Sequence, residues 1–417
     1  MILTKYKLGE ILDVTRGASL SGEYYATEGE YIRLTCGNFD YQNNCFKENK
    51  SKDNLYYVGD FKSEFLMEEG DIITPLTEQA IGLLGSTAII PESGKYIQSQ
   101  DVAKIICKED LLDKDFAFYL ISSALVKQQL SAAAQQTKIR HTSPDKIKDC
   151  TVWIPELSEQ KRIGKLLRSI DRKIELNRAI NQNLEAMAKQ LYDYWFVQFD
   201  FPNEEGKPYK SSGGEMVWNE KLKRKIPNEW DNCKLKDFIN LFDSKRIPLS
   251  SKDREERKGN YPYYGATGIM DYVNEYIFDG DYILLAEDGS TSDSKGFPIV
   301  QYIWGKNWVN NHAHIILPKN EQYLMFTYQM LRSIPAKQIE TGSIQKKISQ
   351  ENLCEYNMVL PNSILIEKYE SIISPLWEKR KLCIEEINAL IKQRDELLPL
   401  LMNGQASVNS DLSTLFN

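Results

Sequence analysis

The chain has 417 residues, of which 42% are hydrophobic and 27% charged, and its formal net charge at pH 7 is -7. This length predicts two or three domains; the apolar runs are too short to cross a membrane and the start is not a signal peptide, so we expect a cytoplasmic globular protein. The negative charge argues against a free-standing nonspecific DNA binder, which would be basic, but it permits local basic patches.

The chain carries a long-period internal repeat. Pairs of short segments match in the same order, and the separation between partners drifts from 227 residues near the start to 210 and then 206. Two copies of one domain that differ in loop length would leave this pattern. The paired segments are 7–8 with 234–235, 70–73 with 280–283, 103–106 with 313–316, 147 with 353, and 154–155 with 360–361.

Each copy is predicted to mix strands with a helix. In the first copy, residues 70–75 and 102–110 predict strands, and residues 116–134 predict an amphipathic helix after them. Residues 323–334 occupy the place of that helix in the second copy. Strands and helices in one compact unit indicate an α+β domain, so the fold class that we expect is α+β with two pseudo-symmetric domains.

A long helix is expected after each copy. The first begins with Ser158 as its N-cap and runs to about Phe196, and the second runs from near Ser363 to Gly404. At 1.5 Å per residue, each would span roughly 60 Å. Sustained heptads predict that the two helices form a coiled coil. Two bundle helices in a larger core are the alternative, but mid-seam polar residues would be costly there.

The heptads assign two seam positions to each helix. In the first helix, one seam holds Ile163, Ile170, Asn177, Leu184 and Leu191, and the other holds Leu166, Lys173, Ile180, Met187 and Tyr194. In the second helix, one seam holds Ile366, Ile373, Arg380, Ile387, Arg394 and Leu401, and the other holds Tyr369, Leu376, Cys383, Leu390 and Leu397.

These patterns divide the chain into six parts. The predicted boundaries are a first domain at 1–157, a first long helix at 158–198, a connector at 199–227, a second domain at 228–362, a second long helix at 363–404 and a tail at 405–417. The connector is rich in Gly, Pro and Ser, and its Trp and Tyr residues indicate that it packs on another part of the protein.

Three stretches resemble the specificity subunits of Type I restriction-modification systems. They are WIPELSEQKRIGKLLRSIDRKIELN, which is similar to the family's entry into the first spacer helix, the connector YWFVQFDFPNEEGKPYKSSGGEMVWNEKLKRKIPNEW, and YPYYGATGIMDYVNEYIFDGDYILLAEDGS followed by NNHAHII. The resemblance covers essentially the whole chain.

The resemblance implies a DNA-reading role without chemistry of its own. Each repeat would be a target recognition domain for one half of a bipartite double-stranded DNA site, and antiparallel pairing of the helices would set the gap. Two modification subunits (adenine methyltransferases) and restriction/translocase subunits would be the partners. S-adenosylmethionine, ATP and Mg are implied for those partners and no cofactor for this chain.

The residues themselves show no enzyme motif. The sequence has no P-loop, no methyltransferase tetrapeptide of the NPPY or DPPY type, and no paired carboxylates that stand out. The seven cysteines form no CxxC pair and indicate reduced thiols. His312 and His314 could share one strand face as metal ligands, but a third ligand is missing, so we expect no metal site.

Candidate DNA contacts lie in polar loops of both domains, because base edges and phosphates are read by Arg, Lys, Asn, Gln and small polar groups. In the first domain they are Arg33, Asn38, Gln79, Lys138 and Arg140. In the second domain they are Tyr263, Tyr264, Gly265, Thr267, Asp288, Ser290, Lys295, Lys346 and Lys347. The YYGATG loop could equally be a tight structural turn. The basic run Lys221, Lys223, Arg224 and Lys225 could grip phosphate or face a partner.

Three other functions remain open at this point. The chain could serve a fused restriction-methylation enzyme of another type, and only the neighbouring gene would separate the two cases. It could be a coiled-coil scaffold that never touches DNA, although the unequal loops of the two copies argue against that. It could be an enzyme, which the missing motifs disfavour.

Overall fold

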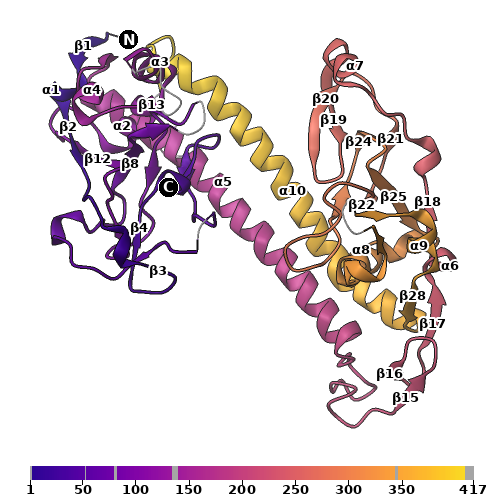
Figure 1. The fold of residues 1–417 in the computed structure, drawn as a ribbon. Coiled ribbons are helices and arrows are strands. Elements are labelled where there is room, and N and C mark those ends of the chain that lie inside the picture. Colours follow the sequence, from indigo (N-terminus) through magenta and orange to yellow (C-terminus); the bar gives the residue numbers. More distant parts are fainter. Residues whose placement is uncertain (1, 52, 79–81, 134–139, 343–345, 409–417) are drawn as a thin grey trace. The chain divides into compact units, whose positions relative to one another are not determined.

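The computed structural model describes residues 2–51, 53–78, 82–133, 140–342 and 346–408 (Figure 1). Its contacts divide the chain into two units, one formed by 1–178 with 385–417 and the other by 179–384. Each long helix therefore contributes one half to each unit. No helix within the described ranges is both long and apolar enough to span a membrane.

The domain of the first unit is built on two four-stranded sheets. One sheet has the order β10-β8-β12-β2, and the other has the order β11-β4-β7-β3. The strands are β1 (Thr4–Lys7), β2 (Leu12–Arg16), β3 (Tyr25–Ala26), β4 (Tyr31–Arg33), β5 (Phe39–Asp40), β6 (Cys45–Phe46), β7 (Tyr56–Tyr57), β8 (Ile72–Pro75), β9 (Thr77–Glu78), β10 (Ala88–Ile89), β11 (Tyr96–Ile97), β12 (Val102–Cys107), β13 (Arg140–His141) and β14 (Thr151–Ile154).

Short helices cover the first of these sheets. They are α1 (Leu8–Ile11), α2 (Lys114–Ser122), α3 (Ala124–Ala133) and α4 (Pro144–Lys148). Asp113 caps α2 by accepting a hydrogen bond from the Phe116 amide at 3.0 Å. The single helix predicted over 116–134 is wrong, because Ser123 adopts an extended backbone (φ −64°, ψ 152°) that separates α2 from α3.

The domain of the second unit repeats this plan. Its sheets have the orders β18-β25-β22-β23 and β20-β19-β24-β21. The strands are β15 (Met216–Asn219), β16 (Arg224–Pro227), β17 (Asp231–Lys234), β18 (Ile239–Leu241), β19 (Lys258–Tyr264), β20 (Ile269–Val273), β21 (Phe278–Asp279), β22 (Tyr282–Ala286), β23 (Val300–Ile303), β24 (Lys306–Val309), β25 (Ala313–Pro318), β26 (Glu340–Thr341), β27 (Lys347–Ile348) and β28 (Asn357–Leu360). The short helices are α6 (Leu235–Phe238), α7 (Ser251–Glu256), α8 (Leu324–Ser333) and α9 (Gln350–Glu355).

The pairing of strands confirms the repeat. Strand β1 pairs with β14 as β17 pairs with β28, and the sheet order β2-β12-β8-β10 matches β18-β25-β22-β23. Both domains also hold one parallel pair, β4 with β11 and β19 with β24. The fold is therefore two pseudo-symmetric α+β domains and two long helices.

The long helices run antiparallel in both units. They are α5 (Leu157–Tyr192), which continues through the π-helical turn η4 (Asp193–Val197), and α10 (Ser363–Met402). In the first unit, Asp171 contacts Arg394 at 3.0 Å and Asn177 contacts Glu386 at 2.8 Å. Residue numbers increase along α5 while those of the contacting residues on α10 decrease, so the two helices are antiparallel. The expected cap Ser158 is instead in the first turn, since α5 begins at Leu157.

The structure places most predicted seam residues on the buried faces of the helices. On α10, the buried ones are Ile366, Tyr369, Ile373, Cys383, Ile387, Arg394 and Leu401, while Leu376, Arg380, Leu390 and Leu397 are partly buried. On α5, Ile163, Ile170 and Asn177 are buried, and Leu184 and Leu191 are partly buried.

The second seam of α5 was predicted one residue too early. Leu167, Ile174 and Ala188 are buried, whereas Met187 and Tyr194 are exposed. Each residue of the second seam therefore follows a residue of the first seam by four positions and not by three. Both spacings occur in a heptad, because the intervals between core positions alternate between three and four residues. Ile174 beside Lys173 was the signal in the sequence that separates the two registers.

The connector packs on the second domain, as its aromatic residues indicated. Phe199 and Phe201 are buried with Trp230 in the core of the second unit, and the Phe201 ring stacks on Trp230 with centroids 5.1 Å apart. Strands β15 and β16 form a hairpin that carries part of the basic run, whose Lys221, Lys223, Arg224 and Lys225 are exposed.

Glu370 in α10 gives the second unit a pH-dependent stability. Its carboxylate accepts hydrogen bonds from the Phe326 amide at 2.7 Å and from the Ser374 hydroxyl at 3.0 Å, yet burial raises its pKa to about 7. Because the folded pKa exceeds the unfolded value, the stabilising contribution is complete below about pH 4 and is lost as pH rises to about 7.

We therefore expect Glu370→Gln to remove a pH-dependent loss of roughly 3 kcal/mol in the free energy of unfolding between pH 4 and pH 8. Denaturant unfolding of both proteins across this range measures the difference. Parallel pH profiles for the two proteins would contradict the assignment.

Candidate nucleic-acid interface

In the first domain, two of the predicted loops meet at the carboxyl end of β8. Strand β9, which follows β8, pairs with β13, and Glu78 stands opposite Arg140. The buried Glu78 carboxylate accepts a hydrogen bond from the Gly82 amide at 2.7 Å, and its other oxygen lies 3.6 Å from the Arg140 guanidinium. Glu78 thus holds the Gly82 amide on one side and a partly exposed Arg side chain on the other.

The loop after β4 joins the same place. The Cys36 Sγ lies 2.9 Å from the Thr77 hydroxyl, and burial raises the pKa of the Cys36 thiol. The loops around Cys36, Thr77 and Arg140 therefore form one contiguous surface, which we call the first loop surface.

Two candidates in this domain have structural roles instead. Arg33 is buried, with its guanidinium 3.8 Å from the Tyr25 ring centre and a hydrogen bond to the Asn54 carbonyl at 3.2 Å. Asn38 is also buried, and its side-chain oxygen accepts from the Thr35 amide at 2.9 Å. Neither side chain is free to contact DNA. Arg140 is exposed enough to do so, whereas Gln79 and Lys138 lie outside the described residues.

In the second domain, Glu287 comes directly after β22, one position before Asp288, which is the repeat counterpart of Glu78 at the separation of 210. Its carboxylate contacts the Arg246 guanidinium at 2.8 Å and the Lys347 ammonium at 3.1 Å. Burial alone would raise the pKa of Glu287, but these hydrogen bonds and the nearby His314 hold it below its usual value. The Lys347 side chain stays half-exposed, as the Arg140 side chain does.

A backbone hydrogen bond joins the corresponding segments in each domain, and its acceptor lies one position later in the second domain. The Thr142 amide donates to the Leu76 carbonyl at 2.9 Å, and the Ile348 amide donates to the Glu287 carbonyl at 2.8 Å. Asp288 forms an isolated bridge with Lys347. Each domain therefore presents a cation from the segment before α4 or α9, held by a carboxylate at the end of the preceding strand.

We call the surface around Glu287 and Lys347 the second loop surface, and His312 and Asp288 extend it. The His312 Nδ1 lies 2.7 Å from the Asp288 carboxylate, and both side chains are partly exposed. The His312 amide also donates to the Asn310 side chain at 2.8 Å, which ties this loop to the end of β24.

Beneath this surface, Asp243, Glu287 and His314 come within 4.8 Å of one another. His314 Nε2 faces the Ile348 carbonyl at 2.8 Å and therefore carries a hydrogen, while Nδ1 lies 2.6 Å from Asp243. Burial would raise the pKa of Asp243, but the His314 hydrogen bond and charge lower it below its usual value. With the cations Arg246 and Lys347 attached to Glu287, the cluster is an ion-pair network in which the ligand atoms are already engaged.

The YYGATG loop combines structural and exposed residues. Tyr263 is buried and its hydroxyl accepts from the Leu249 amide at 3.0 Å, so it belongs to the core. A Cβ on Gly265 would lie 2.4 Å from the Met270 Sδ, so a larger residue there would displace the exposed Met270 side chain. Tyr264 is partly buried, and burial raises its pKa to about 12. Thr267 is exposed at the tip and is free to reach a ligand.

The remaining candidates of the second domain lie at the surface. Ser290 and Lys295 are exposed, and Lys295 lies in the turn closed by the Ser292–Pro298 bridge. Lys346 pairs with Glu340 at 3.1 Å. The amide of Lys295 donates to Asp293, which fixes that turn.

Sequence reasoning missed the carboxylates that organise both surfaces, the buried Glu78 and the partly buried Glu287. Both come shortly after the repeated strand that begins with the GD pair, although they are one position apart in the repeat, so an acidic residue near the end of that strand was the available signal. Arg246 was missed because its partner is 41 residues away in the chain. Between them, the two loop surfaces carry cations, an imidazole and hydroxyls. Groups of these types contact phosphates and base edges.

The basic run on the connector shows no such arrangement. The Lys223 ammonium pairs with Glu220 at 3.1 Å, with both side chains strongly exposed, and the Arg224 guanidinium lies 4.9 Å from the Phe199 ring centre. These contacts tie the run to the connector itself.

Known proteins resemble this chain over most of its length. The specificity subunit of the Type I restriction enzyme MjaIX from Methanocaldococcus jannaschii is 23% identical over 330 residues, covering 74% of this chain and 73% of that protein. The specificity subunit of the Type I restriction enzyme EcoDI from Escherichia coli is 27% identical over 191 residues, covering 43% of this chain and 39% of that protein.

A solved structure has the same fold. The S subunit of a Type-I restriction-modification system from M. genitalium aligns with a TM-score of 0.61 at 18% identity, covering 96% of each chain. A family model described as the Type I restriction modification DNA specificity domain matches residues 3–186 and again 227–386. The chain therefore belongs to the family of the Type I restriction-modification DNA specificity domain, of which it carries two copies.

Proposed function

We propose that this chain is the DNA sequence-specificity subunit of a Type I restriction-modification complex. Each domain reads one half of a bipartite, asymmetric double-stranded DNA site through its loop surface. The observation that carries the proposal is one fold present twice, with different side chains on the two loop surfaces: Arg140 beside Glu78 in one domain, and Lys347 beside Glu287 in the other. Different reading groups on equivalent frames fit two different half-sites.

The chain acts through partners in this proposal. Two modification subunits, which are adenine methyltransferases, use S-adenosylmethionine, and restriction/translocase subunits use ATP and Mg. The chain itself is non-catalytic and holds no cofactor. Its repeated, pseudo-symmetric fold supports the binding of two copies of one partner, because equivalent surfaces on the two domains can accept the same surface twice.

The test is to co-express the chain with the methyltransferase encoded beside it and to map modified adenines across the host genome. We expect one bipartite motif with a fixed gap, present only when this chain is present. A methylome that does not change with this chain, despite a complex that co-purifies, would favour the scaffold function. A cleavage activity in the methyltransferase chain itself would point to a fused enzyme of another type.

A further inference from the structure

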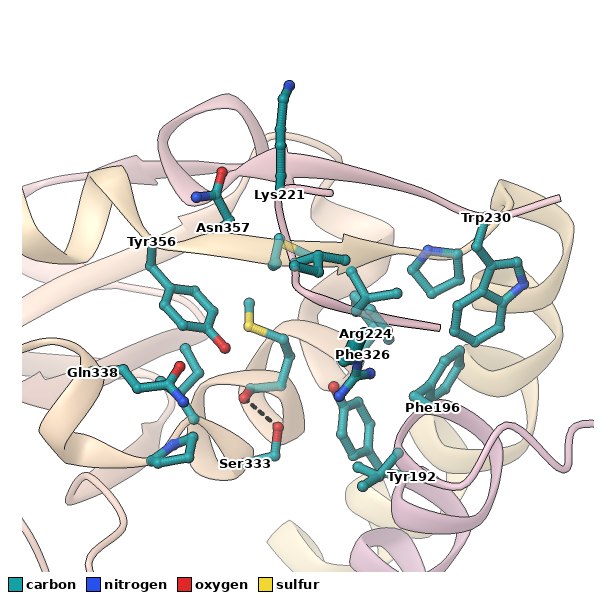
Figure 2. Close-up of a pocket in the computed structure, with 18 of the residues that line it drawn as sticks. Tyr192, Phe196, Lys221, Arg224, Trp230, Phe326, Ser333, Gln338, Tyr356 and Asn357 are labelled. Atoms are coloured by element: carbon teal, nitrogen blue, oxygen red, sulfur yellow. Dashed lines mark hydrogen bonds between the residues drawn. The ribbon is translucent and has the colours of Figure 1, made fainter. Parts of the chain in front are cut away.

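Each unit contains a cavity at the end of a long helix whose lining residues are mainly apolar. The cavity in the first unit is about 590 Å³ and is lined by Leu3, α2, the start of α3, Trp153 and the end of α10. The cavity in the second unit is about 640 Å³ and is lined by residues of α5, α8, β28 and the connector (Figure 2). We call them the first groove and the second groove.

The two grooves are copies of one another. Nine lining residues of the first groove have counterparts in the second at the same chain separations as the sequence repeat. The pairs are Leu3 with Trp230 at 227, Leu120 with Met330, Ser123 with Ser333, Ala124 with Ile334 and Leu125 with Pro335 at 210, and Trp153 with Val359, Leu398 with Tyr192, Met402 with Phe196 and Asn403 with Val197 at 206. Seven of these pairs are apolar in both copies although none of the seven is identical.

Both grooves leave large apolar side chains uncovered. In the first groove, Trp153 is 42% exposed and Leu125 is 40% exposed. In the second groove, Val197 is 46% exposed. Apolar surface that gathers in a concave site, and that recurs in two copies of a domain, marks a place where another molecule binds.

Each groove also has a cation at its rim. In the first groove, the Lys5 ammonium lies 5.7 Å from the Trp153 ring centre. In the second, Figure 2 shows Arg224 extending from the connector toward Tyr192 and Phe326. Among the residues that the structure describes, no carboxylate pairs with Lys5 or Arg224. Glu355, which also lines the second groove, is already held by Lys234 and by Lys236 at 2.7 Å.

We infer that the two grooves dock the same segment of the two modification subunits, an apolar segment that carries an acidic residue. The inference rests on the proposed function, which supplies two copies of one partner. The apolar side chains would fill the grooves, and the carboxylate would pair with Lys5 in one copy and with Arg224 in the other. The apolar contacts of the two docked copies are then equivalent by the repeat, while Lys5 and Arg224 supply the cation from different positions of the chain.

Native mass spectrometry of the co-purified complex tests this inference. Wild-type chain is expected to hold two modification subunits. Leu125→Glu in the first groove, or Val197→Glu in the second, is expected to leave one copy, and the double variant none. Lys5→Glu and Arg224→Glu repel an acidic segment without changing an apolar side chain of either groove, and each should weaken binding of one copy at least tenfold.

Matched surface changes serve as controls. Ile106→Glu in the first unit and Ile364→Glu in the second also place a carboxylate at an exposed apolar position, outside both grooves, and should keep two copies. Two copies retained by all four groove variants would overturn the inference, and so would a wild-type complex with fewer than two copies. If the groove is wrong, the chain-dependent methylation motif of the wild-type complex is unaffected, so the two proposals fail separately.

Discussion

Replacing Asp171 by Ala is expected to lower the free energy of unfolding of the first unit by about 3–5 kcal/mol. Asp171 of α5 is buried against α10 and α2. Its carboxylate accepts hydrogen bonds from the Arg394 guanidinium at 3.0 Å and from the Tyr119 hydroxyl at 2.5 Å. Without this carboxylate, the buried charge of Arg394 keeps only Asp395, whose side chain is largely exposed. An uncompensated buried charge is the costly outcome.

Lys173→Ala supplies the matched control for this change. Lys173 lies two residues further along α5 and pairs with Glu386, but both side chains are exposed to water. Its removal should cost less than about 1 kcal/mol. Denaturant unfolding of both variants measures the difference, and the double change of Asp171 and Arg394 to Leu should recover much of the loss. Equal stability of the Asp171 and Lys173 variants would show that the buried pair has no special weight.

Replacing Glu287 by Gln is expected to destabilise the second domain by about 3 kcal/mol. The change removes the nearer of the two carboxylates that balance the nearly buried Arg246, which keeps only the longer contact of 3.5 Å with Asp243 among the described carboxylates, and it loosens Lys347 at the second loop surface. The control is Glu275→Gln, because Glu275 pairs with Arg257 at 3.3 Å where both side chains are exposed, and its cost should be below about 1 kcal/mol. Hydrogen exchange of the β22 amides reports the local free energy of opening.

The same variant should change the acid sensitivity of the domain. The pKa values of Glu287 and Asp243 are both lowered in the folded state. Their stabilisation is therefore complete above about pH 4.5 and is lost as pH falls through the lowered pKa values. Glu287→Gln should flatten the fall in stability below pH 4.5. An unchanged acid transition would contradict the role of this carboxylate.

The repeat, the two long helices and most seam positions could be predicted, because they depend on local periodicity and on order along the chain. The seam of α10 follows from apolar residues at heptad spacing, and Gly404 ends the helix region with a φ of 75°. Ser123 could not be predicted to break a helix, because α2 and α3 share the apolar pattern of one continuous helix and only packing separates them.

The candidate site was only partly predictable. The sequence located the loops but not the burial of Arg33, Asn38 and Tyr263. Side chains of these types can be buried when each has a partner. The partners are Tyr25, Thr35 and Leu249, and periodicity does not show these contacts. Glu78 and Glu287 act through cations distant in the chain, so only the folded geometry identifies them.

The central claim is that each domain reads its own half of the DNA site. The most direct test maps modified adenines in cells that carry the modification subunit with wild-type chain, with Arg140→Ala or with Lys347→Ala. We expect Arg140→Ala to relax the sequence of one half of the motif and Lys347→Ala to relax the other half, with the gap unchanged, because a lost base contact costs about 1–3 kcal/mol at its own position. Relaxation of the same half by both variants, or a change in both halves by either one, would contradict the claim.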